Sequence, residues 1–281
     1  MTSYSLKNDK LELTVLALGA TVNSLKFLGK ETVLRYDTEE EYLAGTSFLG
    51  AAIGRYGNRI GKARFTLDGK EILLAANEGV NQLHGGPDSY DRRIWTVENA
   101  DDRELRLSIF SPDGDNGFPG NLKMTVTYSL TENGLRIVFE GETDAPTVFA
   151  PTFHPYFVCG GSRPSLFLNA KQHLEVGEGL IPTGVLLPCD GKFDFSEMRE
   201  LDTSFDDAFV LSGEHALTYK TDSYTMEMWT NFPAAQIYSG RPTAVAIEPE
   251  AFPDSPNHPN FPSTTLRPGE KFCKWAEYRF F

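Results

Sequence analysis

Two histidines stand in local settings that suit proton transfer. His154 lies in the run PTFHPYF (151–157), where Pro155 restricts it to an extended backbone and the aromatic neighbours make its surroundings partly apolar. An imidazole held in this way can act as a general acid or base near neutral pH. His84 lies in NQLHGG (81–86), directly before a pair of glycines. The alternative for a lone histidine is a buried ring that only bonds a backbone carbonyl.

A carboxylate later in the chain could be the partner of such a histidine. Glu248 ends an apolar run (245–248) and precedes Pro249. Where a strand runs out into a cleft, a carboxyl group is partly desolvated, which raises its pKa and makes it a usable base. The alternative is a solvated glutamate at the end of a strand. We expect Glu250 to be solvated and Asp254 to form a turn.

Several further polar residues are of types that bind sugar hydroxyls or carboxylates. Asn58 and Arg59 follow a glycine-containing segment that could place an amide beside a guanidinium; an exposed arginine in a turn is the alternative. Asp206, or its neighbour Asp207, could accept hydrogen bonds from hydroxyls. Gln236 interrupts an apolar strand, where its amide would need hydrogen-bond partners.

Other kinds of site have no motif in the sequence. There is no GxSxG elbow, no GxxxxGK[ST] loop and no GxGxxG after a strand, so we expect neither a serine hydrolase nor a nucleotide-binding loop. His84, His154 and His258 could meet in space, but no HxH or HExxH spacing joins them. We therefore expect no metal and no cofactor.

Composition limits the partners and the compartment. The chain has 26 Lys and Arg against 39 Asp and Glu, a net charge of −13, which argues against a nucleic-acid partner because phosphate binding needs a basic surface. No apolar run approaches the ~20 residues of a membrane helix, and no signal peptide is visible. The three cysteines are far apart and odd in number, so no disulfide framework is predicted. We expect a cytoplasmic protein without a membrane partner.

The elements that must position these residues are mostly strands, because the dominant apolar period is two. Residues 124–130 and 135–139 alternate on either side of a turn with Asn133-Gly134, and 65–67 and 71–73 flank Asp68-Gly69, so each pair predicts a hairpin. Helical periodicity is confined to 38–44. Further strands are predicted at 11–15, 105–111, 217–220, 224–230, 235–238, 245–248 and 272–280.

More than ten strands joined by short loops, with hardly a helix, predict an all-β fold built as a large antiparallel sandwich. We find no linker and no internal repeat, and we expect a single domain over residues 1–281. One sheet of such a sandwich packs into the core, while the other can curve into a polar, aromatic-lined cleft. Functional residues should then lie on strands or on the loops that enter them.

Six segments, taken in order, resemble the aldose 1-epimerases, also called galactose mutarotases. The resemblance runs from the fifties to the C-terminus and implies an antiparallel β-supersandwich, in agreement with the periodicity. The chain departs from the pattern at Phe153, where many members have Asn, and at Glu250, where they have Gln. The segments are GRYGNRIGKARFTLDGKE (54–71), NQLHGG (81–86), FHPYF (153–157), LIPTG (180–184), FDDAF (205–209) and IEPEAFPDSPNHPNFPS (247–263).

The resemblance implies an isomerase that interconverts the α and β anomers of an aldohexose. His154 matches the general acid of the family, Glu248 its general base, and His84 a second histidine near the ring oxygen. Glu248 would start ionised and His154 protonated, each holding the other in that state by opposite charge. Tyr156 or Phe252 could stack on the apolar face of the sugar. The residues that match sugar-contacting positions are Asn58, Arg59, Asp206 and Gln236.

Three alternatives remain open on the sequence. A hexose-6-phosphate mutarotase would need cations beside C6, which Arg92 and Arg93 could supply unless they are simply exposed. A sugar-binding protein of the same fold would keep the cleft without turnover. A glycosidase would use Asp206 and Glu248 as paired carboxylates. We expect a free monosaccharide as the partner, and a monomer or homodimer.

Overall fold

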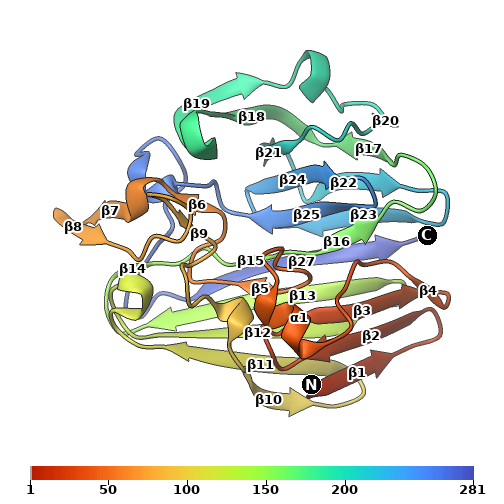
Figure 1. Ribbon diagram of the computed structural model, residues 1–281, viewed down its shortest axis with the longest axis horizontal. Helices are drawn as coiled ribbons and strands as arrows, with labels where there is room; N and C mark the ends of the chain where they lie inside the picture. Colours follow the sequence, from red (N-terminus) through yellow and green to blue (C-terminus); the bar gives the residue numbers. More distant parts are fainter. Residues whose placement is uncertain (1) are drawn as a thin grey trace.

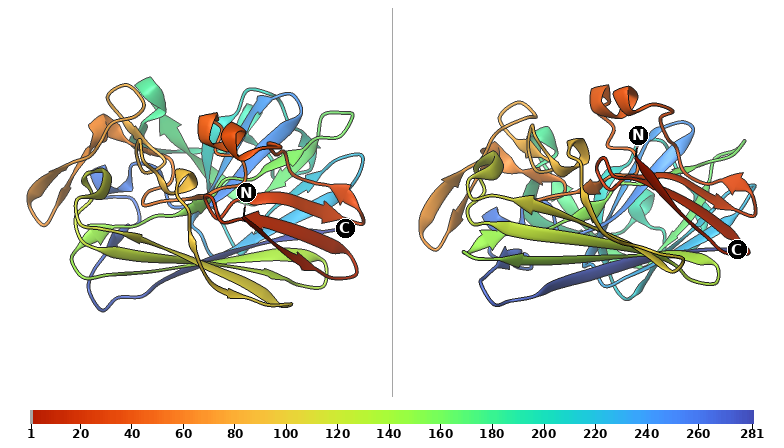
Figure 2. Two further views of the ribbon diagram at one scale, coloured as in Figure 1. Left: turned by 60° about the horizontal axis from the view of Figure 1, so that its bottom comes forward. Right: turned by 90° about the horizontal axis from the view of Figure 1, so that it is seen from below.

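Two antiparallel sheets, one of nine strands and one of six, form most of this computed structural model, which describes residues 2–281. The turned views in Figure 2 show the strands of 96–143, coloured yellow to green, as a layer along one side of the molecule. The all-β antiparallel architecture predicted from the apolar period is confirmed. Among residues 2–281, no helix is long and apolar enough to cross a membrane.

The nine-stranded sheet carries the longest strands, and the six-stranded sheet carries most of the strand residues that line the site described below. The order in the nine-stranded sheet is β10 (Thr96–Ala100), β11 (Glu104–Ser111), β12 (Leu122–Leu130), β13 (Gly134–Thr143), β27 (Phe272–Phe280), β23 (Thr225–Thr230), β22 (His215–Lys220), β17 (Ser165–Leu168) and β20 (Arg199–Glu200). The order in the six-stranded sheet is β16 (Tyr156–Val158), β25 (Ala244–Glu250), β24 (Ala234–Arg241), β21 (Asp206–Leu211), β18 (Ala170–Val176) and β19 (Pro182–Pro188).

The remaining regular structure of residues 2–281 consists of smaller sheets, one short α-helix and single 3₁₀ turns. A four-stranded sheet contains β1 (Ser3–Lys7), β2 (Leu11–Leu16), β3 (Val22–Phe27) and β4 (Lys30–Glu31). Two-stranded pairs are β5 (Ala52–Ile53) with β15 (Thr152–Phe153), β6 (Arg59–Ile60) with β9 (Gln82–Leu83), β7 (Arg64–Leu67) with β8 (Lys70–Leu73), and β14 (Thr147–Val148) with β26 (Thr265–Leu266). The helix is α1 (Glu39–Ala44), and single 3₁₀ turns cover Gly61–Ala63, Tyr90–Arg92, Asp115–Gly117, Glu178–Leu180, Gly191–Phe193 and Ser255–Asn257.

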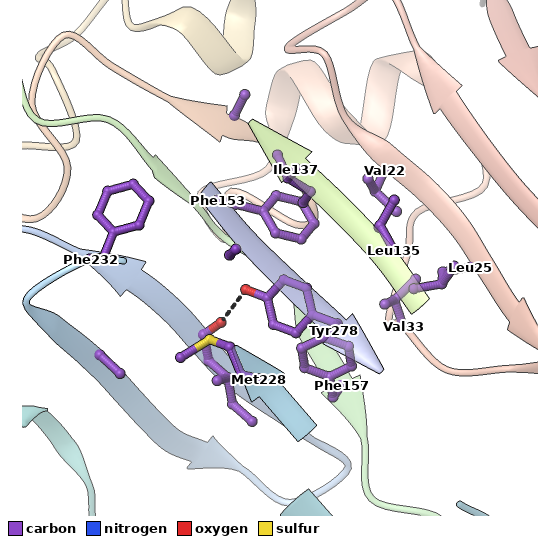
Figure 3. Packing of buried hydrophobic residues seen from close by; sticks show 14 of the residues in the cluster. Val22, Leu25, Val33, Leu135, Ile137, Phe153, Phe157, Met228, Phe232 and Tyr278 are labelled. Atoms are coloured by element: carbon purple, nitrogen blue, oxygen red, sulfur yellow. Dashed lines mark hydrogen bonds between the residues drawn. The ribbon is translucent and has the colours of Figure 1, made fainter. Parts of the chain in front are cut away.

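One hydrophobic cluster joins the two large sheets and fixes the strands beneath the site. The ring of Tyr278, on the nine-stranded sheet, packs against Phe153 and Phe157, with ring centroids 5.8 and 5.1 Å apart (Figure 3). Its hydroxyl donates a hydrogen bond of 3.1 Å to the carbonyl of Ile247 on β25. Ile247 directly precedes Glu248, so the backbone that carries this glutamate is tied to the core.

The predicted hairpins and the predicted helix are confirmed. Strands β12 and β13 pair across residues 131–133, and β7 and β8 pair across Asp68-Gly69. Thr38 caps α1 through a capping box with Glu41. The two-residue strands near the site, such as β6 and β15, were not predicted, because alternation cannot be recognised over so few residues.

Candidate active site

A cavity of about 330 Å³ opens beside the six-stranded sheet, and it gathers seven of the residues that the sequence singled out as catalytic or sugar-binding. These residues come from six separate segments of the chain, so only the folded structure brings them together. The predicted residues that line the cavity are Asn58, Arg59, His84, His154, Asp206, Gln236 and Glu248. The rest of its wall consists of Thr46, Ser47, Phe48, Leu83, Tyr156, Tyr238 and Arg241.

Strand register places the polar side chains of the floor. Glu248 on β25 and Gln236 on β24 are direct partners in the antiparallel pairing, so their side chains lie on the same face of the sheet. Asp206 begins β21, the next strand along. The amide Nε2 of Gln236 donates a hydrogen bond of 2.6 Å to Oδ1 of Asp206. This bond satisfies the inward-facing amide that the sequence left without a partner.

Glu248 and His154 contact each other on the wall of the cavity. Oε1 of Glu248 lies 3.4 Å from Nε2 of His154, and the two side chains are only 3% and 6% exposed. The segment that carries His154 leads into β16, which pairs with β25 on the side opposite to β24. The imidazole and the carboxyl group are therefore held side by side by neighbouring segments of the chain.

Burial determines how this pair holds its protons. Desolvation lowers the pKa of His154 to about 4. Desolvation also raises the pKa of Glu248 well above its ordinary value, and the negative charges of Glu250 and Asp206 add to that rise. Both shifts favour the uncharged forms, so the exchangeable proton of the pair belongs on Glu248 and the ring of His154 is neutral. The sequence argument, in which Glu248 starts ionised and His154 protonated, left out this cost of burying both charges.

His84 is held as a neutral hydrogen-bond donor. The backbone N–H of Asn58 donates a hydrogen bond of 3.1 Å to Nδ1 of His84, so the proton of the neutral ring lies on Nε2. Burial, followed by the charges of His154 and Arg59, lowers the pKa of His84 well below its ordinary value. The rings of His84 and His154 meet edge to face, with centroids 5.1 Å apart. His84 thus stands beside the acid–base pair without carrying charge.

Arg59 is fixed by acidic side chains on two sides. Its Nε and Nη2 donate hydrogen bonds of 2.7 and 2.9 Å to the two carboxylate oxygens of Glu78. Its Nη1 lies 4.0 Å from Oδ2 of Asp206. A guanidinium held in this bidentate geometry has little rotational freedom, so its remaining N–H groups are oriented before a ligand binds.

Glu250 is buried, which contradicts the prediction that it is solvated. It is 1% exposed, and its Oε1 accepts a hydrogen bond of 3.3 Å from Nδ2 of Asn58. Burial raises the pKa of Glu250 well above its ordinary value. The cause is strand geometry, because residues two apart on β25 face the same side and Glu250 follows Glu248 into the interior. Asp254, by contrast, forms a turn as predicted: it adopts φ = 56° and precedes the 3₁₀ turn Ser255–Asn257.

The same residues offer a possible set of metal ligands. Within residues 2–281, His84, His154 and Glu248 are the one group of three such side chains close enough to hold an ion, with ligand atoms within 4.8 Å of one another. Two imidazoles and a carboxylate are ligand types that zinc accepts. His258, which the sequence also considered for a shared metal site, does not belong to this group.

Three residues that the sequence suggested as ligand contacts, Arg92, Arg93 and Phe252, do not line the cavity. Arg92 donates to the backbone carbonyls of Leu43 and Gly45. Arg93 is paired with acidic side chains, with its Nη2 2.7 Å from Oδ1 of Asp115, and neither arginine lines the cavity. Phe252 packs on Phe261 instead of facing the cavity, while Tyr156 does line it. Arg92 and Arg93 are therefore not the cations of a sugar-phosphate site.

Phe48 and Arg241 are cavity residues that the sequence did not reveal. The ring of Phe48 lies 4.6 Å from that of His84 and 5.8 Å from that of His154, between centroids. Arg241 ends β24 at the rim. Neither residue belongs to a motif that was recognised, so no signal in the sequence pointed to them.

A larger groove of about 980 Å³ lies on the other side of Arg59. Its polar residues include Asp254 and His258, whose Oδ2 and Nε2 atoms are 3.2 Å apart. Neither Glu248 nor His154 lines this groove, so its size alone does not make it the site of proton transfer.

Gly85 keeps His84 in position, and we expect its replacement by alanine to disturb the site. Gly85 has φ = +87°, and a Cβ atom there would lie 2.1 Å from the carbonyl oxygen of Gly54. We expect Gly85→Ala to cost about 2–4 kcal/mol of unfolding free energy and to displace His84. Gly79→Ala is the matched control, because Gly79 also has positive φ but no atom lies within 4 Å of its Cβ position. Thermal unfolding and turnover of both variants test this, and equal effects would contradict it.

Comparison with known proteins agrees with this geometry. The sequence profile described as Aldose 1-epimerase matches residues 2–279. The chain is 35% identical to the aldose 1-epimerase of Escherichia coli (strain K12), over 97% of this chain and 93% of that one. It is 30% identical to the galactose mutarotase of Homo sapiens, over 99% and 93%.

Solved structures are similar along the full length of the chain. An aldose epimerase homologue from C. elegans superposes with a TM-score of 0.95 at 28% identity, covering 100% of this chain and 98% of that one. A galactose 1-epimerase from Lactobacillus acidophilus NCFM gives a TM-score of 0.89 at 27% identity, covering 99% and 93%. With the profile match and the full-length identity, these findings show that the chain belongs to the aldose 1-epimerase family.

Proposed function

We propose that this protein interconverts the α and β anomers of an aldohexose, with Glu248 as the general base and His154 as the general acid. The observation that carries this proposal is the 3.4 Å contact between Oε1 of Glu248 and Nε2 of His154, both buried on the wall of a cavity lined by hydroxyl-binding groups. A cyclic hemiacetal opens when the C1 hydroxyl loses its proton and the ring oxygen gains one. The two groups supply these transfers side by side.

Because Glu248 and His154 can exchange a proton, the same two residues can catalyse ring opening and ring closure. Ring opening starts once the exchangeable proton has passed from Glu248 to Nε2 of His154 across their 3.4 Å contact, which leaves the carboxylate of Glu248 free. Glu248 takes the proton of the C1 hydroxyl, His154 gives its proton to the ring oxygen, and the C1–O5 bond breaks to leave a carbonyl at C1. Rotation about C1–C2 and the reverse transfers close the other anomer. The pair ends as it began, so no further reactant is needed.

The neighbouring residues would hold the sugar in this position. His84 would donate from Nε2 toward the ring oxygen, since its Nδ1 is already occupied by Asn58. Arg59 would bind ring hydroxyls through N–H groups that its hydrogen bonds to Glu78 already orient. Asp206 and Gln236 would also bind ring hydroxyls, and the hydrogen bond between them orients both side chains. We assign no step to a metal or cofactor, because the two residues provide both proton transfers.

The test is the rate at which freshly dissolved α-glucose and α-galactose approach anomeric equilibrium, followed by polarimetry. Acceleration above the buffer rate would support the proposal. Sugar binding in a calorimeter without acceleration would instead favour a sugar-binding protein. Release of nitrophenol from nitrophenyl glycosides would favour a glycosidase, and we expect none because Asp206 is committed to Gln236 and Arg59.

The pH profile of kcat/KM should be a broad plateau with two limbs. Below the pKa of His154, about 4, the pair takes up a second proton and Glu248 can no longer act as a base. At alkaline pH, above the raised pKa of Glu248, the pair loses its exchangeable proton, and no acid remains. Exchange NMR across the pH range, after subtraction of the buffer rate, measures both limbs. A midpoint near 6.5, the ordinary value for histidine, would contradict the lowered pKa of His154.

We further propose a single domain in the cytoplasm that acts as a monomer or homodimer on free monosaccharide. The three cysteines are free thiols, and Cys273 is exposed, which suits a reducing compartment. Light scattering of the purified protein distinguishes the two oligomeric states.

A further inference from the structure

Two arginines line the sugar cavity, and they differ in how their charge is balanced. Arg59 is neutralised by its bidentate pair with Glu78. Arg241 has no such partner: among residues 2–281, no carboxylate oxygen lies within 4.0 Å of its guanidinium. A half-buried cation without a counter-ion, on the wall of a ligand cavity, is suited to bind an anionic group of the ligand.

The contacts of Arg241 orient its guanidinium. Arg241 is the last residue of β24, and its Nη2 donates a hydrogen bond to Oγ of Ser47. Its Cζ lies 5.3 Å from the centroid of the Tyr156 ring. These contacts occupy one N–H and one face of the planar group. The guanidinium has five N–H donors in all, so the others remain for a ligand.

Arg241 lies on the His154 side of the acid–base pair. The ring of Tyr156, over which Arg241 is placed, stacks on the ring of His154 with centroids 5.1 Å apart. The positive charge of Arg241 acts on His154, whereas that of Arg59 acts on Glu248 and on His84. In the proposed reaction His154 meets the ring oxygen and Glu248 meets the C1 hydroxyl. The ring oxygen is bonded to C1 and to C5, and in this orientation C1 lies at Glu248, so Arg241 would face the C5 side of the pyranose.

We propose that Arg241 and Ser47 form an anion-binding subsite for the C5 substituent, and that the substrates include an aldohexose with a negative group there. That group is a C6 carboxylate, as in a hexuronic acid, or a phosphate on O6. This inference rests on the proposed function, because the orientation of the sugar follows from the roles of Glu248 and His154. In the role of the cation near C6, Arg241 takes the place of Arg92 and Arg93, because it lines the cavity and they do not.

The experiment compares kcat/KM for glucose, glucuronate and glucose 6-phosphate by exchange NMR. For the wild type we expect at least one anionic sugar to be turned over more efficiently than glucose, and the better of the two identifies the group. In Arg241→Gln, the ratio of anionic to neutral kcat/KM should fall about 10- to 100-fold through a higher KM, as expected when a charge-assisted hydrogen bond is lost. Arg241→Lys keeps the charge and should fall less.

Arg103→Gln is the matched control, because Arg103 is exposed and lies outside the cavity, and its ratio should equal that of the wild type. The inference is overturned if both anionic sugars are poorer substrates than glucose in the wild type, or if Arg241→Gln leaves the ratio unchanged while glucose is turned over. If no sugar is turned over by the wild type, the proposed function itself fails. The two failures are thus distinguishable.

Discussion

Replacing Glu248 by glutamine is expected to reduce kcat/KM for anomer exchange by about 10²–10⁴-fold, the contribution typical of a positioned general base. The amide has the same size and shape but cannot take a proton from the C1 hydroxyl. The fold should tolerate the change well. Burial raises the pKa of Glu248 and so favours its uncharged form, which glutamine imitates. Exchange NMR and thermal unfolding measure the two effects.

The matched control is Glu277→Gln, at another buried glutamate. Glu277 lies on β27 and accepts hydrogen bonds from Arg279 and Thr131, and its pKa is lowered despite its burial, because Arg279 and Thr131 stabilise the charged form. This variant should lose stability and keep its activity, the opposite of Glu248→Gln. Activity within threefold of the wild type (roughly 0.7 kcal/mol) in Glu248→Gln would exclude this residue as the base.

Replacing His154 by asparagine is expected to cause a loss of similar size, about 10²–10⁴-fold. Asparagine preserves a polar side chain but cannot exchange a proton with the ring oxygen. His84 should not take over, because its Nδ1 accepts a hydrogen bond from the backbone of Asn58 and it is His154, not His84, whose ring nitrogen pairs with Glu248. The acid limb of the pH profile, which belongs to His154, should disappear with the activity.

His173→Asn is the control for removing a buried imidazole. His173 is 5% exposed and stacks on Phe193, with ring centroids 3.7 Å apart, and it does not line the cavity. Its loss should lower the melting temperature and leave anomer exchange unchanged. A His154→Asn variant that folds and keeps the acid limb of the wild type would show that another group is the acid.

Local pattern was enough to predict much of the fold. Strand β12 of the nine-stranded sheet alternates polar and apolar residues because one face packs on the core, and Asn133-Gly134 marks its turn into β13. Asp68-Gly69 marks the turn of the separate β7–β8 pair. The same reasoning failed for Glu250. Every residue of β25 is buried, so the strand shows no alternation from which the direction of a side chain could be inferred.

The site residues were predicted from their residue types and their sequence neighbours, but the sequence did not show which of them contact one another. Glu248 and Gln236 meet because β24 and β25 pair in one register, and His154 meets Glu248 because β16 joins the other edge of β25. Arg241 and Phe48 enter the cavity only through this arrangement. No spacing along the chain encodes such contacts.

By itself, the sequence determined that this chain is all-β and antiparallel, and it predicted which imidazoles and carboxylate could move protons, because side-chain chemistry and the period of a strand are local properties. The tertiary structure decided which groups touch, which cation faces the cavity without a counter-ion, and how the pair at Glu248 and His154 holds its proton. Those properties depend on burial and on distances between strands remote in sequence, and both arise only when the two sheets pack together.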